Sequence, residues 1–422
     1  MESKNLRPYN FIDLFAGAGG MSEGFLSSGF SPVAHVEMNP EACLTLKTRA
    51  CYYYLTEQGS GNIYRRYLRG KITRDELYSY VPLKVLETII NKKMAKETMQ
   101  EIFESIDTLM GKHAIEKVDV IVGGPPCQAY SLVGRAVSSD NMINDPRNYL
   151  YQLYCRMLKK YQPDMFVFEN VPGLLTACGG KYYKNMKKEF KRFGYDLHDK
   201  VLNASDFGVL QSRNRVILIG WKKGSAHNYP EFQKVSCDFK VNDIFRDLPF
   251  LQAGEEGRRY NAGRINKYLK TSGIRTQDDI LTWHIARPHI ERDREIYRHV
   301  VRAWDQSAIR LKYTNLPDEL KTHKNTSAFL DRFKVVASDL PASHTVMAHL
   351  SKDGHYFIHP DVNQARSITV REAARLQSFP DNYYFEGSRT SVFTQIGNAV
   401  PPAMAKGIAE GIFCELERKC LT

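Results

Sequence analysis

Short apolar runs, each ending abruptly in glycine or polar residues, recur along the first half of the chain. They span residues 10–15, 32–37, 118–122 and 165–168. Runs this apolar are typical of strands that are covered on both faces of a parallel sheet. Between them, apolar residues recur every three or four positions, as they do in helices that pack on a sheet. The pattern predicts an α/β fold with a doubly wound, Rossmann-like sheet.

Two further strands are predicted at residues 195–204 and 215–221, the second of them antiparallel and at the end of the sheet. Helical spacing returns at residues 369–377 and in a last helix at residues 403–418. No helix precedes the first strand, so the last helix is expected to return and cover the open edge there. Its return would bring Asn398 close to the glycine turn that follows the first strand.

Two segments interrupt the alternation of strands and helices. Residues 51–105 predict two or three helices inserted between the second and third strands. The cluster of tyrosines and arginines at residues 64–69 is expected to be an ordinary helix face, with contact to a nucleic-acid backbone as the alternative. Residues 222–363 are rich in turn formers and predict a smaller irregular domain of mostly β structure and loops. The other domain is then formed by residues 1–221 and 364–422.

Charge and cysteine content narrow the classes of partner and compartment. The chain has 59 basic and 47 acidic residues, a net charge of +12 and a pI near 9.1, which point to a polyanionic partner such as nucleic acid. Its eight cysteines include no CxxC pair, which argues against zinc sites and a disulfide framework and favours a reducing, intracellular compartment. His355 and His359 lack a third ligand, so no metal site is expected. Neither a signal peptide nor a membrane span is predicted.

The first strand runs directly into a glycine turn, AGAGGMSEGF at residues 16–25. Ser22 stands where the dehydrogenase fingerprint needs glycine, and no lysine follows as in a phosphate-binding loop. The turn therefore favours a nucleoside ligand without a pyrophosphate. Glu37 ends the second strand, where a carboxylate suits the two hydroxyls of a ribose.

Candidate chemistry follows the third and fourth apolar runs. The stretch GGPPCQAYS at residues 123–131 places Cys127 where the carboxyl end of a strand meets a ligand, so its thiol is either a low-pKa nucleophile or an ordinary core thiol. Glu169 ends the next strand and is expected on the same rim. Arg213 and Arg215, two positions apart on an extended segment, are expected to face the same way and serve an anion or a polarised carbonyl.

These motifs resemble, in order, those of the S-adenosylmethionine-dependent DNA (cytosine-5) methyltransferase family. The resemblance covers the chain except for the two interruptions, and the pair PPCQ and ENV in this order is highly specific. It rests on DLFAGAGGMSEGF (13–25), VEMNP (36–40), Ile106-Asp107, GGPPCQAYS (123–131), DPRNYL (145–150), FENVPG (168–173), QSRNR (211–215), REAARLQSFPD (371–381) and QIGNAVPP (395–402).

The resemblance implies a mechanism in which the Cys127 thiolate adds to C6 of a cytosine flipped out of duplex DNA. Glu169 would hold N3 and N4, Arg213 would contact O2, and Arg215 would brace the site. Residues 222–363 would read a short duplex sequence. The cofactor-binding positions implied for S-adenosylmethionine are Phe15, Gly17, Gly19, Gly20, Glu37, Met38, Asp107, Leu150 and Asn398.

Three rival functions are weighed against this one: a tRNA cytosine-5 methyltransferase, a catalytically inactive DNA-binding regulator on the same fold, and a nicotinamide dehydrogenase. The long segment 222–363 favours DNA over tRNA. The expected setting is the bacterial cytoplasm, associated with the nucleoid, with a monomer acting on double-stranded DNA. A cognate restriction endonuclease is a conceivable partner that nothing in the chain proves. Arg371 and Arg375, one helical turn apart, either bind phosphate or bridge the domains.

Overall fold

A seven-stranded sheet forms the centre of the protein. The computed structural model describes residues 9–126, 149–235, 238–322 and 330–418. The strand order is β3-β2-β1-β4-β5-β7-β6, and all neighbouring pairs are parallel except those that β7 makes with β5 and β6. The strands are β1 (Asn10–Leu14), β2 (Ser31–Glu37), β3 (Ile89–Asn91), β4 (Val120–Gly123), β5 (Met165–Asn170), β6 (Tyr195–Asn203) and β7 (Asn214–Lys222).

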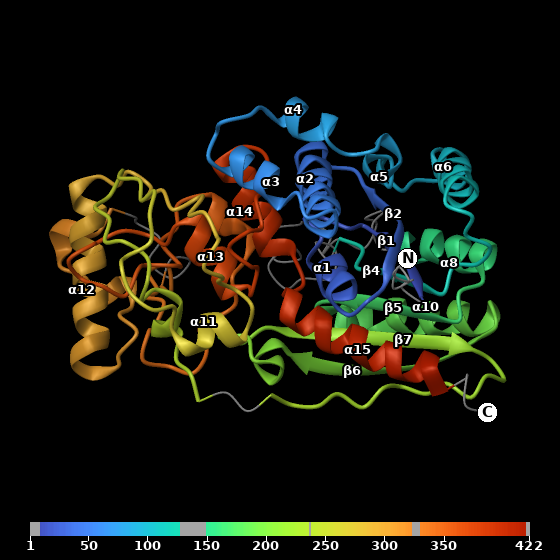
Figure 1. Ribbon diagram of the computed structural model, residues 1–422. Coiled ribbons are helices and arrows are strands. Elements are labelled where there is room, and N and C mark those ends of the chain that lie inside the picture. Colours follow the sequence, from blue (N-terminus) through green and yellow to red (C-terminus); the bar gives the residue numbers. More distant parts are fainter. Residues whose placement is uncertain (1–8, 127–148, 236–237, 323–329, 419–422) are drawn as a thin grey trace.

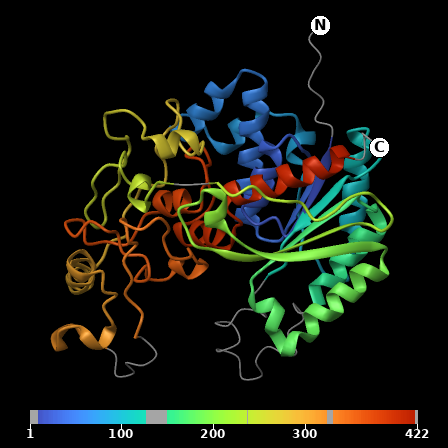
Figure 2. The same cartoon turned by 90° about the horizontal axis from the view of Figure 1, so that it is seen from below.

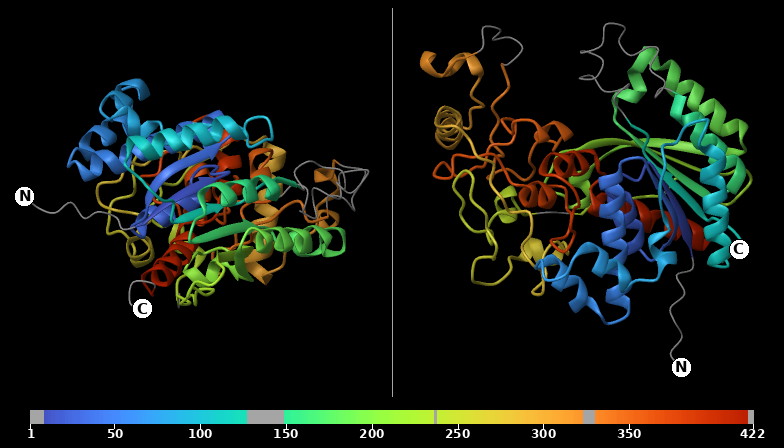
Figure 3. Two further views of the ribbon diagram at one scale, coloured as in Figure 1. Left: turned by 90° about the vertical axis from the view of Figure 1, so that its right-hand side faces the viewer. Right: turned by 90° about the horizontal axis from the view of Figure 1, so that it is seen from above.

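Helices cover both faces of this sheet, which confirms the predicted doubly wound α/β fold (Figure 3). Alternate side chains of each strand enter opposite cores, so that Phe11 packs toward one layer and Ile12 toward the other. One layer contains α1 (Gly20–Ser27), α2 (Pro40–Glu57) and α15 (Pro402–Arg418), and the other contains α6 (Met99–Lys112), α8 (Leu150–Tyr161) and α10 (Lys181–Arg192).

Two details of the predicted sheet are wrong. β1 lies in the middle of the sheet, so α15 covers no edge there; it packs across α1, where a Cβ on Gly24 would lie 2.4 Å from the backbone of Ala405. β7 is antiparallel as expected but lies between β5 and β6, and β6 forms the edge. The long hairpin of β6 and β7 lets the later strand turn back into the inner position.

The predicted insertion is shorter than residues 51–105. β3 lies inside that range and pairs in parallel with β2, with His35 opposite Ile89. The helices beside it have a small core of their own, which includes Leu55, Tyr64 and Leu86. The inserted part therefore ends before β3, and Ile90 belongs to a strand rather than to a helix. Its helices are α3 (Gly61–Leu68), α4 (Arg74–Ser79) and α5 (Leu83–Leu86).

Residues 222–363 form the irregular region that the sequence predicts, although it is less β-rich. Within its described residues, extended structure is limited to isolated bridges such as Val335 with Ile358. The region lies beside the sheet, and the carboxyl ends of the parallel strands point toward it (Figures 1 and 2). Its helices are η4 (Val241–Ile244), α11 (Lys267–Thr271), α12 (Glu291–Ser307), η5 (Tyr313–Asn315), η6 (Asp318–Leu320) and η7 (Ala348–Ser351).

The predicted boundary at residues 363 and 364 does not separate two cores. The helices α13 (Val370–Leu376) and α14 (Arg389–Asn398) share one hydrophobic core with residues of the irregular region, including Ile244 and Val346. Arg375, fully buried, pairs with Asp381 and with Asp247 at 2.6 Å each. Arg375 therefore bridges the irregular region and the segment after α13, which is one of the two roles expected for it; the other was phosphate binding.

Arg371 has the same role one turn earlier in α13. Its guanidinium is fully buried and donates to the carbonyl of Thr282 at 3.1 Å and to the hydroxyl of Thr282 at 2.7 Å. A guanidinium without exposed surface cannot reach the phosphates of a bound polyanion, so the phosphate alternative fails for both arginines.

Candidate active site

The residues with predicted chemical roles come mainly from the carboxyl ends of β1, β2, β4 and β5. In an open parallel sheet these ends form the edge at which ligands bind. The connections that follow them are the glycine turn after β1, the start of α2 after β2, the cysteine loop after β4, and the short helices α9 (Gly173–Thr176) and η2 (Ala177–Gly180) after β5.

The glycine turn has a backbone that only a few residue types tolerate. Phe15, Gly17 and Gly19 have φ values of 58°, 55° and 79°, in the left-handed region. Gly20 is needed for a different reason, because a Cβ there would lie 2.2 Å from the carbonyl oxygen of Val400. The same close approach brings the end of α14, with exposed Asn398, next to the turn, as the sequence predicted.

Glu37 connects the end of β2 to this turn. Its Oε2 accepts a hydrogen bond from the backbone N–H of Gly17 at 2.8 Å, and its Oε1 accepts one from Asn39 at 2.7 Å. Met38 follows with 57% of its surface exposed. A carboxylate oriented by the backbone beside an exposed apolar side chain fits the ribose and the adenine of a nucleoside.

Ser22, the residue that breaks the dehydrogenase fingerprint, has a structural role. Its hydroxyl donates to the carboxylate of Asp13, which is 1% exposed in β1 beneath the turn. Burial raises the pKa of Asp13 to about 7, although the Ser22 hydrogen bond works in the opposite direction. The contact ties β1 to α1, and no sequence motif indicated it.

Replacement of Asp13 by asparagine is expected to flatten the pH dependence of stability. The folded protein keeps the Asp13 proton up to a pKa of about 7, whereas the unfolded chain releases it near 3.8, so the free energy of unfolding falls as pH rises between these values. Relative to Asp13→Asn, the free energy of unfolding of the wild type should fall by about 3 kcal/mol between pH 4.5 and pH 8. Urea unfolding of both proteins at pH 4.5 and 8 measures the change, and a difference that does not vary with pH would contradict the raised pKa.

The loop that carries Cys127 begins in a tightly packed position. A Cβ on Gly123 would lie 2.4 Å from the carbonyl oxygen of Leu14 in β1, and the side-chain amide of Asn170 donates to the carbonyl of Pro125 at 3.2 Å. The loop thus starts between the ends of β1 and β5. Cys127 itself lies outside the described residues, one position beyond Pro126.

Glu169 lies on the same rim, as expected from its position at the end of β5. Its Oε1 forms an ion pair of 2.6 Å with Nε of Arg215, and both side chains are nearly buried. Its Oε2 faces the start of the cysteine loop, because a Cβ on Gly124 would lie only 2.3 Å from that oxygen. One carboxylate oxygen is therefore held by an arginine, and the other points toward the loop of Cys127.

Arg213 does not join this pair, which corrects the expectation that the two arginines face one group. Its guanidinium is 1% exposed and donates to the carbonyls of Val346 at 2.8 Å and Gly397 at 2.9 Å. The chain before β7 runs beside Ser343 rather than in the sheet, so the alternation of a regular strand does not extend back to residue 213. Arg213 therefore ties the segment before β7 to α14 and to the irregular region.

Substitution of Gly124 by alanine is expected to displace the Glu169 carboxylate and so to lower the rate of the reaction at this rim about tenfold or more. The added methyl group would overlap Oε2, so the ion pair with Arg215 or the loop must shift. Gly111→Ala in α6 is the matched control, because a Cβ there has nothing within 4 Å. Steady-state rates of the two variants test the contact; equal rates would show that Glu169 has room to move.

Two other predicted cofactor residues differ in their positions. Leu150 begins α8 and packs against the core at the carboxyl end of the sheet. Asp107 does not lie with the other residues: its carboxylate accepts from Lys160 at 2.7 Å and Tyr161 at 3.1 Å, at the end of α8 that precedes β5. The polar residue beside Glu37 is instead Asn91, at the end of β3, whose amide donates to the carbonyl of Glu37 at 3.1 Å.

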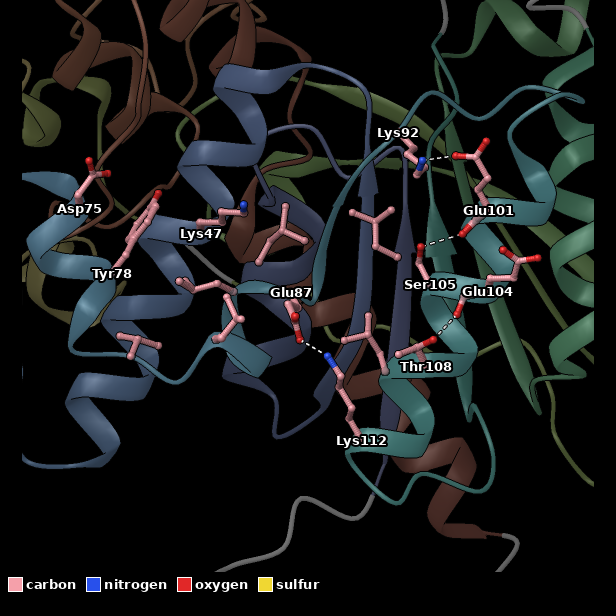
Figure 4. A pocket seen from close by; sticks show the side chains of 16 residues that line it. Lys47, Asp75, Tyr78, Glu87, Lys92, Glu101, Glu104, Ser105, Thr108 and Lys112 are labelled. Carbon is pink, nitrogen blue, oxygen red and sulfur yellow. Dashed lines mark hydrogen bonds and ion pairs between the residues drawn. The ribbon is translucent and has the colours of Figure 1, made fainter.

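A cavity of about 950 Å³ lies away from this rim, between α6 and the inserted helices (Figure 4). Ion pairs join Lys92 to Glu101 and Lys112 to Glu87 along it. None of the predicted site residues lines it. Among the described residues, no group of three His, Cys, Asp or Glu side chains could hold a metal ion, and no described helix has the length and apolar character to cross a bilayer.

The fold is that of a Rossmann-like methyltransferase. A solved structure of a DNA modification methyltransferase encoded within an E. coli prophage superimposes with a TM-score of 0.64 over 97% of this chain and 99% of that chain, at 23% identity, which supports the fold. The profile of the family described as C-5 cytosine-specific DNA methylase matches residues 9–67 and 85–414. The chain therefore belongs to this family, and it is a DNA cytosine-5 methyltransferase.

Two curated relatives extend the comparison. Type II methyltransferase M.Bpa9945I of Bacillus paralicheniformis is 42% identical over 440 residues, covering 95% of this chain and 98% of that protein. Type II methyltransferase M1.HphI of Haemophilus parahaemolyticus is 32% identical over 402 residues, covering 95% of this chain and 86% of that protein. Within the matched span, the family profile passes over residues 68–84, a segment that contains α4 and ends before β3, whereas nearly all of α3 lies in the matched residues.

Proposed function

We propose that this enzyme methylates C5 of a cytosine within a short duplex sequence, with Cys127 as the covalent nucleophile and S-adenosylmethionine as the methyl donor. The observation that carries the proposal is the ion pair of 2.6 Å between Oε1 of Glu169 and Nε of Arg215. The other carboxylate oxygen of Glu169, Oε2, faces the start of the loop that carries Cys127. A nucleophile and an acid on one rim are what the chemistry requires, because C5 of cytosine is a poor nucleophile by itself.

The residues of the chain divide the reaction between them. The Cys127 thiolate adds to C6, and Glu169 protonates N3, so that the electron pair of the C5–C6 bond becomes available at C5. Arg215, rather than Arg213, orients Glu169 during this step. After C5 has been methylated, the C5 proton departs to solvent, the N3 proton returns to Glu169 and the thiolate leaves C6, which restores the aromatic ring and the free enzyme.

The methyl donor fits the turn after β1. S-adenosylmethionine supplies an electrophilic sulfonium methyl group. Glu37 would hold the ribose hydroxyls, exposed Met38 would pack against the adenine, and Asn398 would approach from the end of α14. The backbone of Phe15, Gly17, Gly19 and Gly20 would cover the rest of the ligand, with Leu150 beyond it.

Residues 222–363 would act as the target recognition domain. DNA would lie between them and the rim, with the target base flipped out toward Cys127. The net charge of +12 and the position of this region opposite the carboxyl ends of the strands support that arrangement (Figure 1). The names of the curated relatives support a type II modification role in a bacterial cell. In the proposed function, the enzyme acts as a monomer and a cognate endonuclease is its partner in the cell.

Transfer of labelled methyl groups from S-adenosylmethionine to duplex DNA or to tRNA tests the function. We expect label only in DNA, and bisulfite sequencing should place it at cytosines within one short motif. Label in tRNA alone would establish the RNA alternative. Binding of DNA without any transfer would instead favour the inactive regulator.

A further inference from the structure

A buried tyrosine from the far part of the chain contacts the glycine turn. Tyr383 follows α13, is 1% exposed, and donates its hydroxyl hydrogen bond to the carbonyl of Ala18. A Cβ on Gly19 would lie 2.9 Å from the same hydroxyl oxygen. The hydroxyl is thus enclosed against the turn at two adjacent residues.

This hydrogen bond fixes one peptide plane in the turn. The carbonyl of Ala18 and the N–H of Gly19 belong to the same plane and point in opposite directions. Tyr383 holds the carbonyl, and the carbonyl of Ala16 accepts the Gly19 N–H at 2.9 Å. With both ends held, the plane cannot rotate and turn the Ala18 oxygen toward the edge where the ligand approaches.

The position of the Tyr383 side chain is itself fixed from several sides. Its ring packs against Phe379 and Phe385 with centroids 4.9 Å and 5.1 Å away, and the guanidinium of Arg49 lies 4.7 Å from its centroid. Arg371 donates to its backbone carbonyl at 3.2 Å. These neighbours leave the hydroxyl a single direction, toward Ala18.

We infer that Tyr383 is a positioning residue for the methyl donor, which sets the glycine turn in its binding conformation before the ligand arrives. The inference rests on the proposed role of that turn in binding S-adenosylmethionine. Without the hydroxyl, the buried Ala18 carbonyl has lost its partner, and the turn occupies the competent conformation for only part of the time. Apparent affinity falls in proportion to that fraction.

The test compares Tyr383→Phe with Tyr64→Phe. Tyr64 is a matched control because its buried hydroxyl donates to the carbonyl of neighbouring Asn382 at 2.9 Å but does not contact the turn. Calorimetric titration with S-adenosylhomocysteine should give a Kd about tenfold higher for Tyr383→Phe and within twofold of wild type for Tyr64→Phe. Hydrogen exchange without ligand should show lost protection at residues 16–20 in Tyr383→Phe alone.

Several results would overturn the inference. Equal losses in both variants would mean that the segment acts only through general stability, and unchanged affinity with unchanged exchange would mean that the hydroxyl does not set the turn. Should Tyr383→Phe not fold, Tyr383→Met is measured in its place by the same exchange experiment. A wild type that does not bind S-adenosylhomocysteine would overturn the proposed methyl donor, a failure visible before any variant is compared.

Discussion

Cys127→Ala is expected to lower methyl transfer by about 10⁴-fold or more, because without the thiolate no covalent adduct forms at C6 and C5 stays a poor nucleophile. Binding of duplex DNA should change little, since the thiol is needed for chemistry rather than for contact with the backbone. The rate of labelled methyl transfer at saturating DNA and methyl donor measures the loss.

The covalent step can be observed separately from turnover. DNA with 5-fluorocytosine at the target has no C5 proton to lose, so the adduct should accumulate with wild type and survive denaturing electrophoresis. Cys178→Ala is the matched control, because Cys178 is free, exposed and located in the segment after β5. An adduct with Cys127→Ala, or its absence with Cys178→Ala, would assign the nucleophile to another residue.

The sequence predicted the rim well because its elements are local. β4 and β5 are short apolar runs that pair in parallel, so chain order alone indicates that Glu169, near the end of β5, shares an edge of the sheet with the start of the loop that leads from β4 to Cys127. The position of Asn398 beside the glycine turn was also predicted, although for a wrong reason: the last helix returns to pack on α1 and does not cover an edge of the sheet.

Contacts between distant segments could not be predicted in the same way. β3 has three residues, too few to show a period, and its two isoleucines fit the helical spacing around them equally well. Asp107 was matched by its place after a long insertion, whereas the strand end beside Glu37 carries Asn91. A dipeptide matched by its letters alone can therefore lie in a helix, as Asp107 does in α6, away from the strand end that it was expected to occupy.

Arg213 and Tyr383 show a second limit. Both are buried groups whose partners are backbone carbonyls: Val346 and Gly397 for the arginine, and Ala18 for the tyrosine. Carbonyls carry no signal in the sequence, because every residue has one. The sequence could therefore indicate that Arg213 matters but could not distinguish a guanidinium that contacts a base from one that joins two segments.

Glu169→Gln is expected to lower kcat about 10³-fold while leaving the affinity for DNA within a few fold. The amide oxygen can still accept from Arg215, so the side chain should keep its place in the space left by Gly124. What is lost is the proton that Oε2 delivers to N3 of the base in the proposed mechanism. Single-turnover rates and DNA binding separate this loss of chemistry from a loss of contact.

A control on the same strand distinguishes catalysis from the cost of breaking a buried ion pair. Asp164, just before β5, is 6% exposed and pairs with Lys222 at 3.2 Å, at the opposite end of the strand from the rim. Asp164→Asn should lower stability and leave kcat nearly unchanged. If the two variants lost kcat to the same extent, Glu169 would be structural. If Arg215→Gln added nothing to the loss in Glu169→Gln, the arginine would act through Glu169 alone, as their 2.6 Å pair implies.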